Sequence, residues 1–378
     1  SSSRRNMLRI LLPTIDFPPA RGGVARYIGA IVKTYPDQVK LLELKRVKLD
    51  NLVLRLIFQA KTYDAIWTHH VLPIGTAAYI AKRFTGKPYV VFLHGLDFDL
   101  ARRNSWKRWL AKLVLGSASR IVTNSQALAT EVRAFVELSR EPLVVFPTLE
   151  DQFIEAAKSS RGPRDKVNLQ KLAELAIGVS RPGTSMFVAN QTLSEGEGPR
   201  KLGMGLRLLT VGRLVERKGH LKVIQALTKL PDVTYHIVGD GPLRADLQKL
   251  VTSLDLDARV KFTTHATDDQ LPDIYRAADI FVMPTYKSEL DREGFGIVYL
   301  EAQLFGVPVI ATRYPGVDEA VHGGEGGLLI GEKPEDLLDA INRLKDPVVR
   351  SKFGARGRAW VEREFNREQQ MYKLRELL

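Results

Sequence analysis

Two carboxylates and two glycines occur together in one short segment, which reads EGFGIVYLE from residue 293 to residue 301. Glu293 precedes a helical pattern and Glu301 follows about two turns along it, so the two side chains can meet different parts of one elongated ligand. Gly294 and Gly296 let a ligand approach the backbone, and the first amides of a helix are unpaired donors at the positive end of its dipole. The pattern predicts a bound diphosphate, with sugar and ribose hydroxyls as partners of the two ionised acceptors.

A pair of cations follows the apolar run Leu206–Val211. Arg213 and Lys218 are separated by a turn that Gly219 closes, so both side chains can converge on one diphosphate. The guanidinium supplies a planar fork and the ammonium a point charge. A solvated basic turn is the alternative. Together with the EGFG segment, the pair predicts neutralisation of a diphosphate leaving group.

A second candidate anion cradle follows the first apolar run, at the Gly22-Gly23 pair. Adjacent glycines permit close backbone approach, and a helical pattern resumes at Val24. Asp16 and Arg21 flank the pair and are candidate acceptor contacts. An ordinary turn is the alternative, since paired glycines are common in turns.

His94 follows the buried apolar run Pro88–Leu93 and precedes a glycine. In a parallel sheet such a position faces the ligand site, so we expect His94 to position substrate rather than to cap a helix or pack in the core. Asp97 is then a candidate acceptor contact. His69 and His70 lack a partner at metal-ligand spacing, and we expect them to be structural.

These candidate residues follow short apolar runs that alternate with helical patterns. Nearly continuous apolar strands separated by amphipathic segments are typical of parallel sheets covered on both faces, and ligands bind beyond the carboxyl ends of such strands. Two successive series of runs predict two Rossmann-like domains in an α/β chain of 378 residues. The runs are Leu8–Leu12, Ala65–Trp67, Pro88–Leu93, Arg120–Thr123 and Leu143–Phe146, then Leu206–Val211, Thr234–Val238, Val260–Phe262, Ile280–Met283 and Val309–Ala311.

The EGFG segment and the Arg213–Lys218 turn resemble the motifs of the retaining, nucleotide-sugar-dependent glycosyltransferases of family 4. The resemblance implies the GT-B fold, in which two Rossmann-like domains face each other across a cleft and the C-terminal helix crosses back to the first domain. It also implies that Glu293 holds the transferred sugar and that Glu301 binds the ribose. Arg213 and Lys218 would stabilise the departing nucleoside diphosphate, and His94 would lie beside the transferred sugar.

The same resemblance assigns the remaining donor contacts. Gly239 would line the base pocket, and the loop at His265 would contact the base through backbone groups, although it lacks the family's usual glycine. The donor is therefore expected to be a UDP- or GDP-sugar, with the base left open. The residues expected to bind it are Gly22, Gly23, Gly239, His265, Gly294, Phe295, Gly296 and Glu301.

Retaining transfer in this family is thought to proceed on one face of the sugar, with the donor phosphate taking the acceptor proton. A site of phosphate-binding cations and sugar-holding carboxylates fits that course, because positioning and electrostatic stabilisation supply the rate. The chain has no metal-binding Asp-x-Asp motif in a suitable loop. We therefore expect transfer of a hexosyl unit without a cofactor or a metal ion.

The chain is expected to divide where its pattern changes. Residues 1–155 form a basic acceptor domain, 156–204 an extended linker or insertion, 205–345 the donor domain and 346–378 the crossing helices. We expect the opening SSSRRNM to be the remnant of a tag rather than a signal peptide, because Arg9 interrupts the apolar stretch that follows.

The excess positive charge lies in the first half of the chain. Residues 1–145 contain 23 Lys and Arg against 10 Asp and Glu, while the whole chain has a net charge of +13. That distribution suggests an anionic partner for the first domain. The segment Leu100–Arg120 is the densest cationic stretch, and Trp106 and Trp109 recur in it at helical spacing. It can lie on an anionic membrane surface or pack as an ordinary amphipathic helix, and the sequence favours neither.

The sequence thus predicts a cytoplasmic enzyme that glycosylates a lipid-linked or glycan acceptor, peripheral on the inner face of the plasma membrane if residues 100–120 bind lipid. Apolar runs fall short of the ~20 residues that span a bilayer, and the chain has no cysteine for a disulfide or a thiolate metal site. A nucleotide-sugar hydrolase or epimerase of the same fold is one alternative. A basic module that binds nucleic acid or membrane without catalysis is another, but it leaves the glycines and paired glutamates unexplained, so no nucleic-acid partner is expected.

Overall fold

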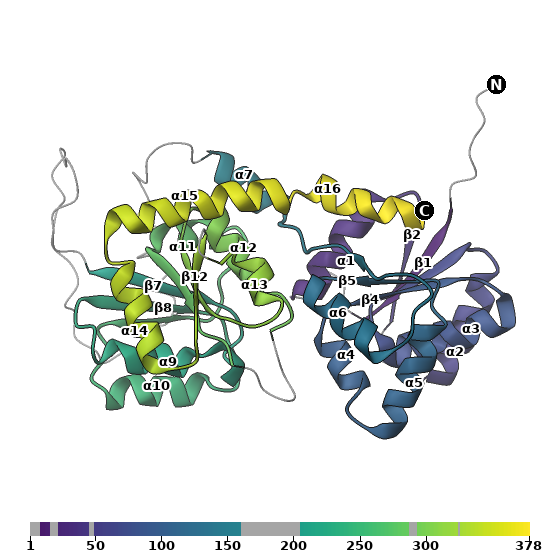
Figure 1. Cartoon of the computed structure of the whole chain (residues 1–378), viewed down its shortest axis with the longest axis horizontal. Helices are drawn as coiled ribbons and strands as arrows, with labels where there is room; N and C mark the ends of the chain where they lie inside the picture. Colours follow the sequence, from purple (N-terminus) through teal and green to yellow (C-terminus); the bar gives the residue numbers. More distant parts are fainter. Residues whose placement is uncertain (1–7, 16–21, 45–48, 160–204, 287–292, 324–325) are drawn as a thin grey trace, which may run out of the picture.

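The computed structural model describes residues 8–15, 22–44, 49–159, 205–286, 293–323 and 326–378. Two α/β domains lie next to each other, and each is built on a six-stranded sheet flanked by helices (Figure 1). Every strand pair in both sheets is parallel. The predicted architecture of two Rossmann-like domains is therefore confirmed.

The first sheet has the strand order β2-β1-β3-β4-β5-β6. Its inner strands are apolar along their length because helices cover both faces, and every residue of β1 and β4 is buried. The elements of this half are β1 (Ile10–Thr14), α1 (Gly23–Thr34), β2 (Val39–Glu43), α2 (Leu49–Ala60), β3 (Ala65–Thr68), η1 (Val71–Gly75), α3 (Thr76–Thr85), β4 (Tyr89–Leu93), α4 (Leu96–Ala101), α5 (Ser105–Gly116), β5 (Arg120–Thr123), α6 (Gln126–Phe135), β6 (Leu143–Val144) and α7 (Asp151–Ser159).

The second sheet has the strand order β12-β11-β10-β7-β8-β9. Its inner strands β10 and β11 are likewise buried at every residue. The elements of this half are β7 (Leu206–Val211), η2 (Glu216–Lys218), α9 (His220–Leu227), β8 (Val233–Val238), α10 (Arg244–Ser253), β9 (Val260–Thr263), α11 (Leu271–Ala277), β10 (Ile280–Met283), α12 (Ile297–Leu304), β11 (Val309–Thr312), α13 (Val317–Ala320), β12 (Gly327–Ile330), α14 (Pro334–Arg343), α15 (Pro347–Glu364), α16 (Arg367–Tyr372) and η3 (Lys373–Leu377).

Two strands were not predicted from the sequence, and both lie at sheet edges. β2 mixes buried with exposed residues, and β12 is a short strand that begins with glycine. An edge strand has a partner on one side only, so it does not need the continuous apolar run that marks an inner strand. The cationic stretch Leu100–Arg120 also differs from a single helix, because α4 ends at Ala101 and α5 begins at Ser105.

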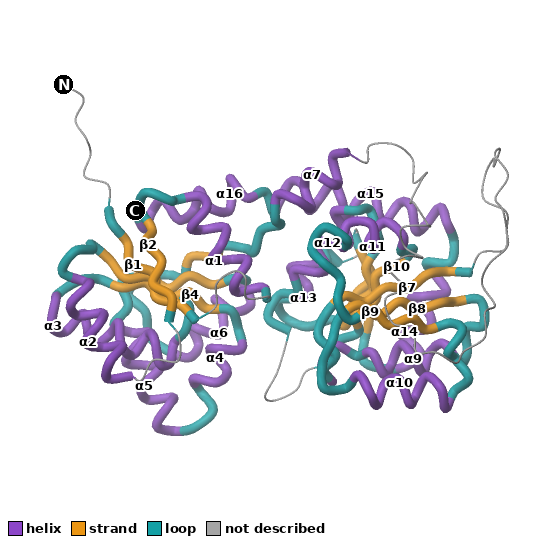
Figure 2. Tube along the Cα trace, turned by 180° about the vertical axis from the view of Figure 1, so that it is seen from behind, coloured by secondary structure: helices purple, strands orange, loops and turns teal. Residues whose placement is uncertain are grey.

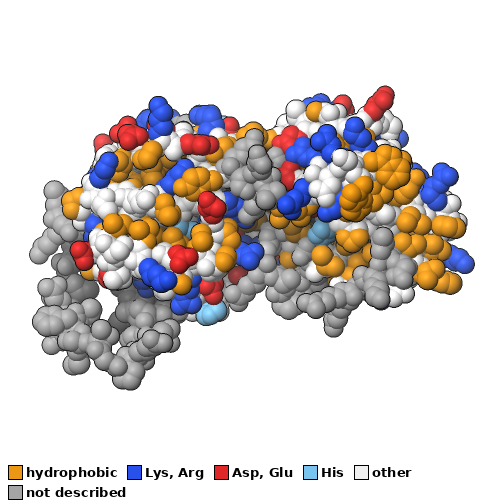
Figure 3. All heavy atoms as spheres, turned by 90° about the horizontal axis from the view of Figure 1, so that it is seen from below, with side chains coloured by type: hydrophobic (Ala, Val, Ile, Leu, Met, Phe, Trp, Pro, Cys, Tyr) orange, Lys and Arg blue, Asp and Glu red, His pale blue; other side chains and the backbone are white. Residues whose placement is uncertain are grey.

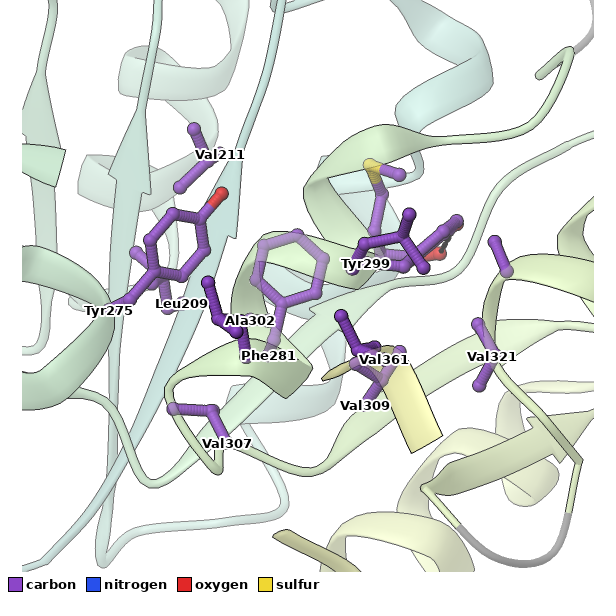
Figure 4. Packing of buried hydrophobic residues seen from close by; sticks show 14 of the residues in the cluster. Leu209, Val211, Tyr275, Phe281, Tyr299, Ala302, Val307, Val309, Val321 and Val361 are labelled. Carbon is purple, nitrogen blue, oxygen red and sulfur yellow. Dashed lines mark hydrogen bonds between the residues drawn. The ribbon is translucent and has the colours of Figure 1, made fainter. Parts of the chain in front are cut away.

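The packing beneath α12 fixes the helix that carries the second glutamate of the EGFG segment. Tyr299 of α12 and Phe281 of β10 are fully buried and pack edge to face, with ring centroids 5.9 Å apart. Figure 4 shows Tyr299, Phe281 and Tyr275 among the apolar side chains of this core. The buried packing of Tyr299 therefore fixes the first turn of α12 against the sheet.

The C-terminal helices cross from the second domain to the first, as predicted. α15 packs along α12, whereas α16 packs on α1 (Figure 1). The Tyr35 hydroxyl of the first domain donates to the backbone oxygen of Met371 at 2.6 Å. Met371 and Leu374 are buried in the core of the first domain.

The chain also crosses in the other direction, between β6 and α7. Phe153 of α7 is buried in the core of the second domain. The two crossings lie side by side (Figures 1 and 2): the amide of Phe146 donates to Oε1 of Gln370 at 3.0 Å, and its ring lies 5.4 Å from that of Phe365. α7 spans the predicted domain boundary at residue 155, and residues 160–204 of the predicted linker lie outside the described residues.

Candidate active site

A cleft of about 650 Å³ lies between the two domains, at the carboxyl ends of strands from both sheets. The first domain lines it with the start of α1 and the loops after β4 and β5, and the second with the loops after β7, β8 and β9 and the start of α12. Parallel sheets bind ligands at this edge. The residues of the sequence-predicted site that line the cleft are Gly22, Gly23, His94, Arg213, Lys218, Gly239, His265, Glu293, Gly294, Phe295 and Gly296.

Glu293 binds two cations of the turn after β7. Its Oε2 accepts a hydrogen bond from Lys218 Nζ at 2.6 Å and another from the guanidinium of Arg217. Burial alone would raise the pKa of Glu293, but the charges of Lys218 and Arg217 outweigh that effect and hold the pKa below its ordinary value. An ionised Glu293 therefore fixes the ammonium of Lys218, a buried residue, at the wall of the cleft.

Arg217 also lines the cleft, although the sequence pattern pointed only to Arg213 and Lys218. Those two residues line the cleft as well, and the short helix η2 brings Arg217 to Glu293. Arg213 is exposed, whereas Lys218 is buried. Three basic side chains of one turn thus line the cleft, and the segment GRLVERKG contained all three.

The helix α12 begins at the cleft. Its N-cap, Gly296, has φ 85°, a left-handed conformation that favours glycine. The first residues of the helix, Ile297 and Val298, line the cleft together with Arg213 and Lys218. Helix-start amides beside an arginine and a lysine form the kind of site that binds phosphate groups. The structure thus brings the residues of the predicted diphosphate site together, and diphosphate binding there stays a prediction.

The two domains touch at Gly294 and at the start of α6. A Cβ atom at Gly294 would lie 2.4 Å from the backbone oxygen of His94, so only glycine fits between the two loops. The carboxylate of Glu319 in α13 accepts hydrogen bonds from the amides of Gln126 and Ala127, at 2.7 and 2.8 Å. A carboxylate at a helix N-terminus is favourable. The domains are therefore in direct contact around the cleft.

Glu301, the predicted ribose ligand, lies behind the cleft rather than in its lining. It is 1 % exposed, and its carboxylate accepts hydrogen bonds from Arg26 and, at 2.6 Å, from the hydroxyl of Tyr275. Arg26 belongs to α1 of the first domain and also pairs with Glu150 and Asp268. Burial alone would lower the pKa of Arg26, but these carboxylates raise it. The ribose role of Glu301 stays a prediction.

His94 lines the cleft, and Asp97 supports the loop that carries it. The backbone amide of His94 donates to Oδ1 of Asp97 at 2.9 Å, and Oδ2 of Asp97 is a buried atom. Burial raises the pKa of Asp97 to about 6. Asp97 does not line the cleft, so its predicted contact with the acceptor stays a prediction. His69, expected to be structural, contacts the ring of His94 with 3.0 Å between Nδ1 and Nε2.

The remaining predicted residues are Asp16 and Arg21, which lie outside the described residues. Arg26 and Tyr27, just beyond the glycine pair, line the cleft instead. Neither residue was predictable from the sequence, because a helical residue that faces a second domain has no local signature. Within the described part of the chain, no three His, Asp or Glu side chains are grouped as a metal site would require.

Two family models match the chain. A model described as glycosyl transferases group 1 matches residues 199–360, and one described as a glycosyl transferase 4-like domain matches residues 12–148. The two matches divide between the second and the first domain and include both walls of the cleft.

Relatives of known activity match nearly the whole chain. It is 40% identical to the GDP-mannose-dependent monoacylated alpha-(1-6)-phosphatidylinositol monomannoside mannosyltransferase of Corynebacterium glutamicum, over 97% of this chain and 96% of the relative. The GDP-mannose-dependent alpha-(1-6)-phosphatidylinositol monomannoside mannosyltransferase of Mycolicibacterium smegmatis is 28% identical and covers 93% of each chain.

Solved structures confirm the fold. The crystal structure of Anabaena HepE in complex with UDP superposes with a TM-score of 0.76 at 20% identity, over 98% of this chain and 99% of that one. The protein is a member of the retaining, nucleotide-sugar-dependent glycosyltransferases of family 4, group 1, with the GT-B fold, and it is a hexosyltransferase.

Proposed function

We propose that this enzyme transfers mannose from GDP-mannose to a phosphatidylinositol mannoside at a membrane surface. The observation that carries the proposal is the 40% identity, over almost the full length of both chains, with the mannosyltransferase of Corynebacterium glutamicum. A second relative with the same donor and the same class of acceptor in its name covers 93% of the chain. This agreement favours GDP-mannose over the UDP-sugars that the sequence left open.

The charges of the cleft support a role for the second domain in binding the donor diphosphate. Lys218 and Arg217 are held by Glu293, and Arg213 is exposed beside them. These side chains and the start of α12 would neutralise the charge that develops on the leaving GDP as the glycosidic bond breaks. We infer that this neutralisation needs no metal ion, since three cations of the chain already serve it.

The sugar would then lie between Glu293 and His94, which line opposite walls of the cleft. In this arrangement Glu293 accepts from sugar hydroxyls while it orients Lys218. The acceptor would enter from the first domain, whose glycine pair Gly22-Gly23 also lines the cleft. Positioning of both substrates, rather than a protein nucleophile, would supply most of the rate.

The surface of the first domain supports a lipid acceptor. Trp106 and Trp109 of α5 are 60% and 65% exposed, so they do not pack inward as an ordinary amphipathic helix would place them. The buried face of α5 is formed by Ala111, Val114 and Leu115 instead. The two tryptophans therefore project where a membrane interface can receive them.

The helices next to α5 carry further exposed apolar side chains: α3 and α4 contact α5, and α2 contacts α3. Figure 3, which views the molecule from the side of α5, shows hydrophobic and Lys or Arg side chains gathered over the first domain at the right. We name this surface the apolar-basic face. Its exposed apolar members are Leu54 and Phe58 of α2, Phe84 of α3, Leu96 and Leu100 of α4, and Trp106 and Trp109 of α5.

We propose that this face lies on the anionic inner leaflet of the plasma membrane, with the enzyme peripheral and on the cytoplasmic side. An anionic surface attracts the basic side chains, and the aromatic rings fit the headgroup layer. Among the described residues, no helix is long and apolar enough to cross a bilayer.

Radiolabelled transfer tests the proposed donor and acceptor. Purified enzyme is incubated with GDP-mannose, UDP-glucose or UDP-galactose, with and without vesicles that contain phosphatidylinositol monomannoside. Label should enter the lipid only from GDP-mannose and only when the acceptor is present. Release of free mannose at the same rate without acceptor would instead indicate a hydrolase, and transfer from a UDP-sugar alone would contradict the proposed donor.

A further inference from the structure

His69 is a fully buried histidine whose ring lies behind that of His94. It follows β3, and His94 follows the neighbouring strand β4, so the sheet places the two side chains together. Nδ1 of His69 is 3.0 Å from Nε2 of His94, and the ring planes are inclined by only 11°. Phe92 stacks on His69 at 4.6 Å between ring centroids, and Tyr27 packs edge to face against His94 at 5.2 Å.

His69 is uncharged in this environment. Burial, reinforced by the neighbouring rings of His94 and His70, lowers the pKa of His69 well below its ordinary value. A neutral imidazole carries one hydrogen, on Nδ1 or on Nε2, and its other nitrogen accepts. In the hydrogen bond between Nδ1 of His69 and Nε2 of His94, one nitrogen therefore carries the hydrogen and donates, and the other accepts.

The surroundings of His69 decide which ring donates. Its Nε2 is buried and has no hydrogen-bond partner among the described residues. A hydrogen on Nε2 would be a buried donor without an acceptor, and such unpaired N–H groups are rarer in proteins than unpaired acceptors. The hydrogen of His69 is thus assigned to Nδ1, which donates to Nε2 of His94. A neutral His94 must then carry its own hydrogen on Nδ1.

We propose that His69 is a positioning residue that holds His94 as the Nδ1–H tautomer, so that His94 presents a fixed donor to a hydroxyl oxygen of the transferred sugar. The hydrogen bond from His69 also orients the ring of His94. Because the N–H of His69 points at Nε2 of His94, that nitrogen cannot take up a proton without a clash between the two hydrogens, so His94 stays neutral. The proposal deepens the proposed function and rests on sugar binding at the cleft that His94 lines. His69 itself touches no substrate.

Two substitutions of His69 separate this role from simple packing. His69→Phe keeps an aromatic ring against Phe92 but removes the donor, whereas His69→Asn places an amide N–H near the position of Nδ1. With whichever nucleotide sugar the wild type transfers, His69→Phe should lower kcat about tenfold, a typical effect of losing an orienting partner. His69→Asn should recover most of that loss, and the Kd of GDP should be unchanged in both variants.

A double-variant cycle with His94→Ala tests whether His69 acts through His94. In the His94→Ala background, His69→Phe should cause no further loss, because the ring that it orients is absent. Independent losses that multiply, equal losses in the Phe and Asn variants, or weaker GDP binding would each overturn the inference.

The tautomers can be read without any turnover. Long-range proton–nitrogen spectra of the whole protein labelled with ¹⁵N-histidine distinguish the two neutral forms, and the chain has 7 histidines. Comparison with His69→Asn identifies the signals of His69 and His94. Nδ1–H signatures for both rings are expected, and an Nε2–H signature for His69 would refute the assignment even if GDP-mannose proved not to be the donor.

Discussion

Arg26 of the first domain and Glu301 of the second are paired between the domains, through a hydrogen bond between the guanidinium and Oε1. The other carboxylate oxygen accepts from Tyr275, so both oxygens of the predicted ribose ligand already have partners. A donor ribose that binds Glu301 must therefore either add a hydrogen bond beside that of Arg26 or displace Arg26 from the carboxylate. If Glu301 binds the ribose as predicted, nucleotide binding must change this contact between the domains.

Replacing Arg26 with methionine should destabilise the protein by about 3 kcal/mol, because the buried carboxylate of Glu301 loses its cation. The stability is measured by urea unfolding followed through tryptophan fluorescence. The double variant Arg26→Met/Glu301→Gln should recover part of the loss, since no buried charge is then left unpaired. Arg133→Met removes a pair between exposed side chains, with Glu141, and should have little effect. Equal effects of the two arginine variants would contradict the buried-pair interpretation.

Lys218→Met should lower kcat at least a hundredfold and weaken GDP binding, because it removes a preorganised positive charge at the diphosphate site. Transfer rates and GDP titration by calorimetry measure the two effects. Lys249→Met is the matched control, since Lys249 is a surface lysine of α10 with an 81% exposed side chain. Adding Mg²⁺ or EDTA should leave the wild-type rate unchanged if the cations of the chain serve the leaving group. A rate that EDTA abolishes would overturn the metal-independent proposal.

The pH dependence of stability should report Asp97. Its pKa is about 6 in the folded protein against an ordinary value of 3.8, so the folded state binds a proton between these pH values that the unfolded chain has released. Stability therefore falls as pH rises through this window. An asparagine at this position cannot titrate, so the free energy of unfolding of Asp97→Asn lacks this pH dependence. Relative to the wild type, the variant should gain about 2 kcal/mol of stability between pH 4 and pH 8. If the stability difference between the variant and the wild type does not change with pH, burial does not disfavour the ionised form of Asp97.

Gly294→Ala should reduce activity strongly while the domains stay folded. A methyl group at this position would lie 2.4 Å from the backbone oxygen of His94, so the two loops must separate. Gly116→Ala is the control, because a Cβ atom there meets only an ordinary contact at 3.5 Å. The rate of transfer and the radius of gyration in solution are measured for both. Wild-type activity in Gly294→Ala would mean that the contact between the loops is not needed for transfer.

The double variant Trp106→Ala/Trp109→Ala should bind vesicles of phosphatidylglycerol at least tenfold more weakly than the wild type, because two interfacial aromatic rings are lost. Co-sedimentation with vesicles measures the binding, and wild type should not bind neutral phosphatidylcholine. Tyr372→Ala removes an exposed aromatic side chain of α16, on the other side of the first domain (Figure 1), and should bind as the wild type does. Unchanged binding by the tryptophan variant would show that the apolar-basic face does not bind the membrane.

The inner strands of both sheets were predictable because burial on both faces requires a continuous apolar run, as in β4 and β10. The edge strands β2 and β12 were not, since exposure on one side permits polar residues and glycine. The crossing helices followed from the family resemblance. The return crossing at α7 had no local signal, because Phe153 packs against residues more than a hundred positions away in the chain.

The glycines and cations that follow strands were predictable because the carboxyl ends of parallel strands meet at one edge. Contacts between the domains were not: Arg26 and Glu301 are far apart in sequence, and Arg26 lies in an ordinary helical pattern. The sequence shows no metal-ligand partner for His69, whose neighbour in the structure is the histidine that follows the next strand, His94. Pairings of this kind depend on the register between strands, which the sequence does not specify.

The two crossings of the chain also limit how the cleft can open. A single connection would let one domain swing and twist freely about the other, but the segment after β6 and the segment that joins α15 to α16 run together, tied by Phe146, Gln370 and Phe365. Two joined connections can bend together, yet they resist relative twisting. The domains should therefore separate by rotation about one axis, so that the acceptor and the nucleotide sugar return to the same relative position on every turnover.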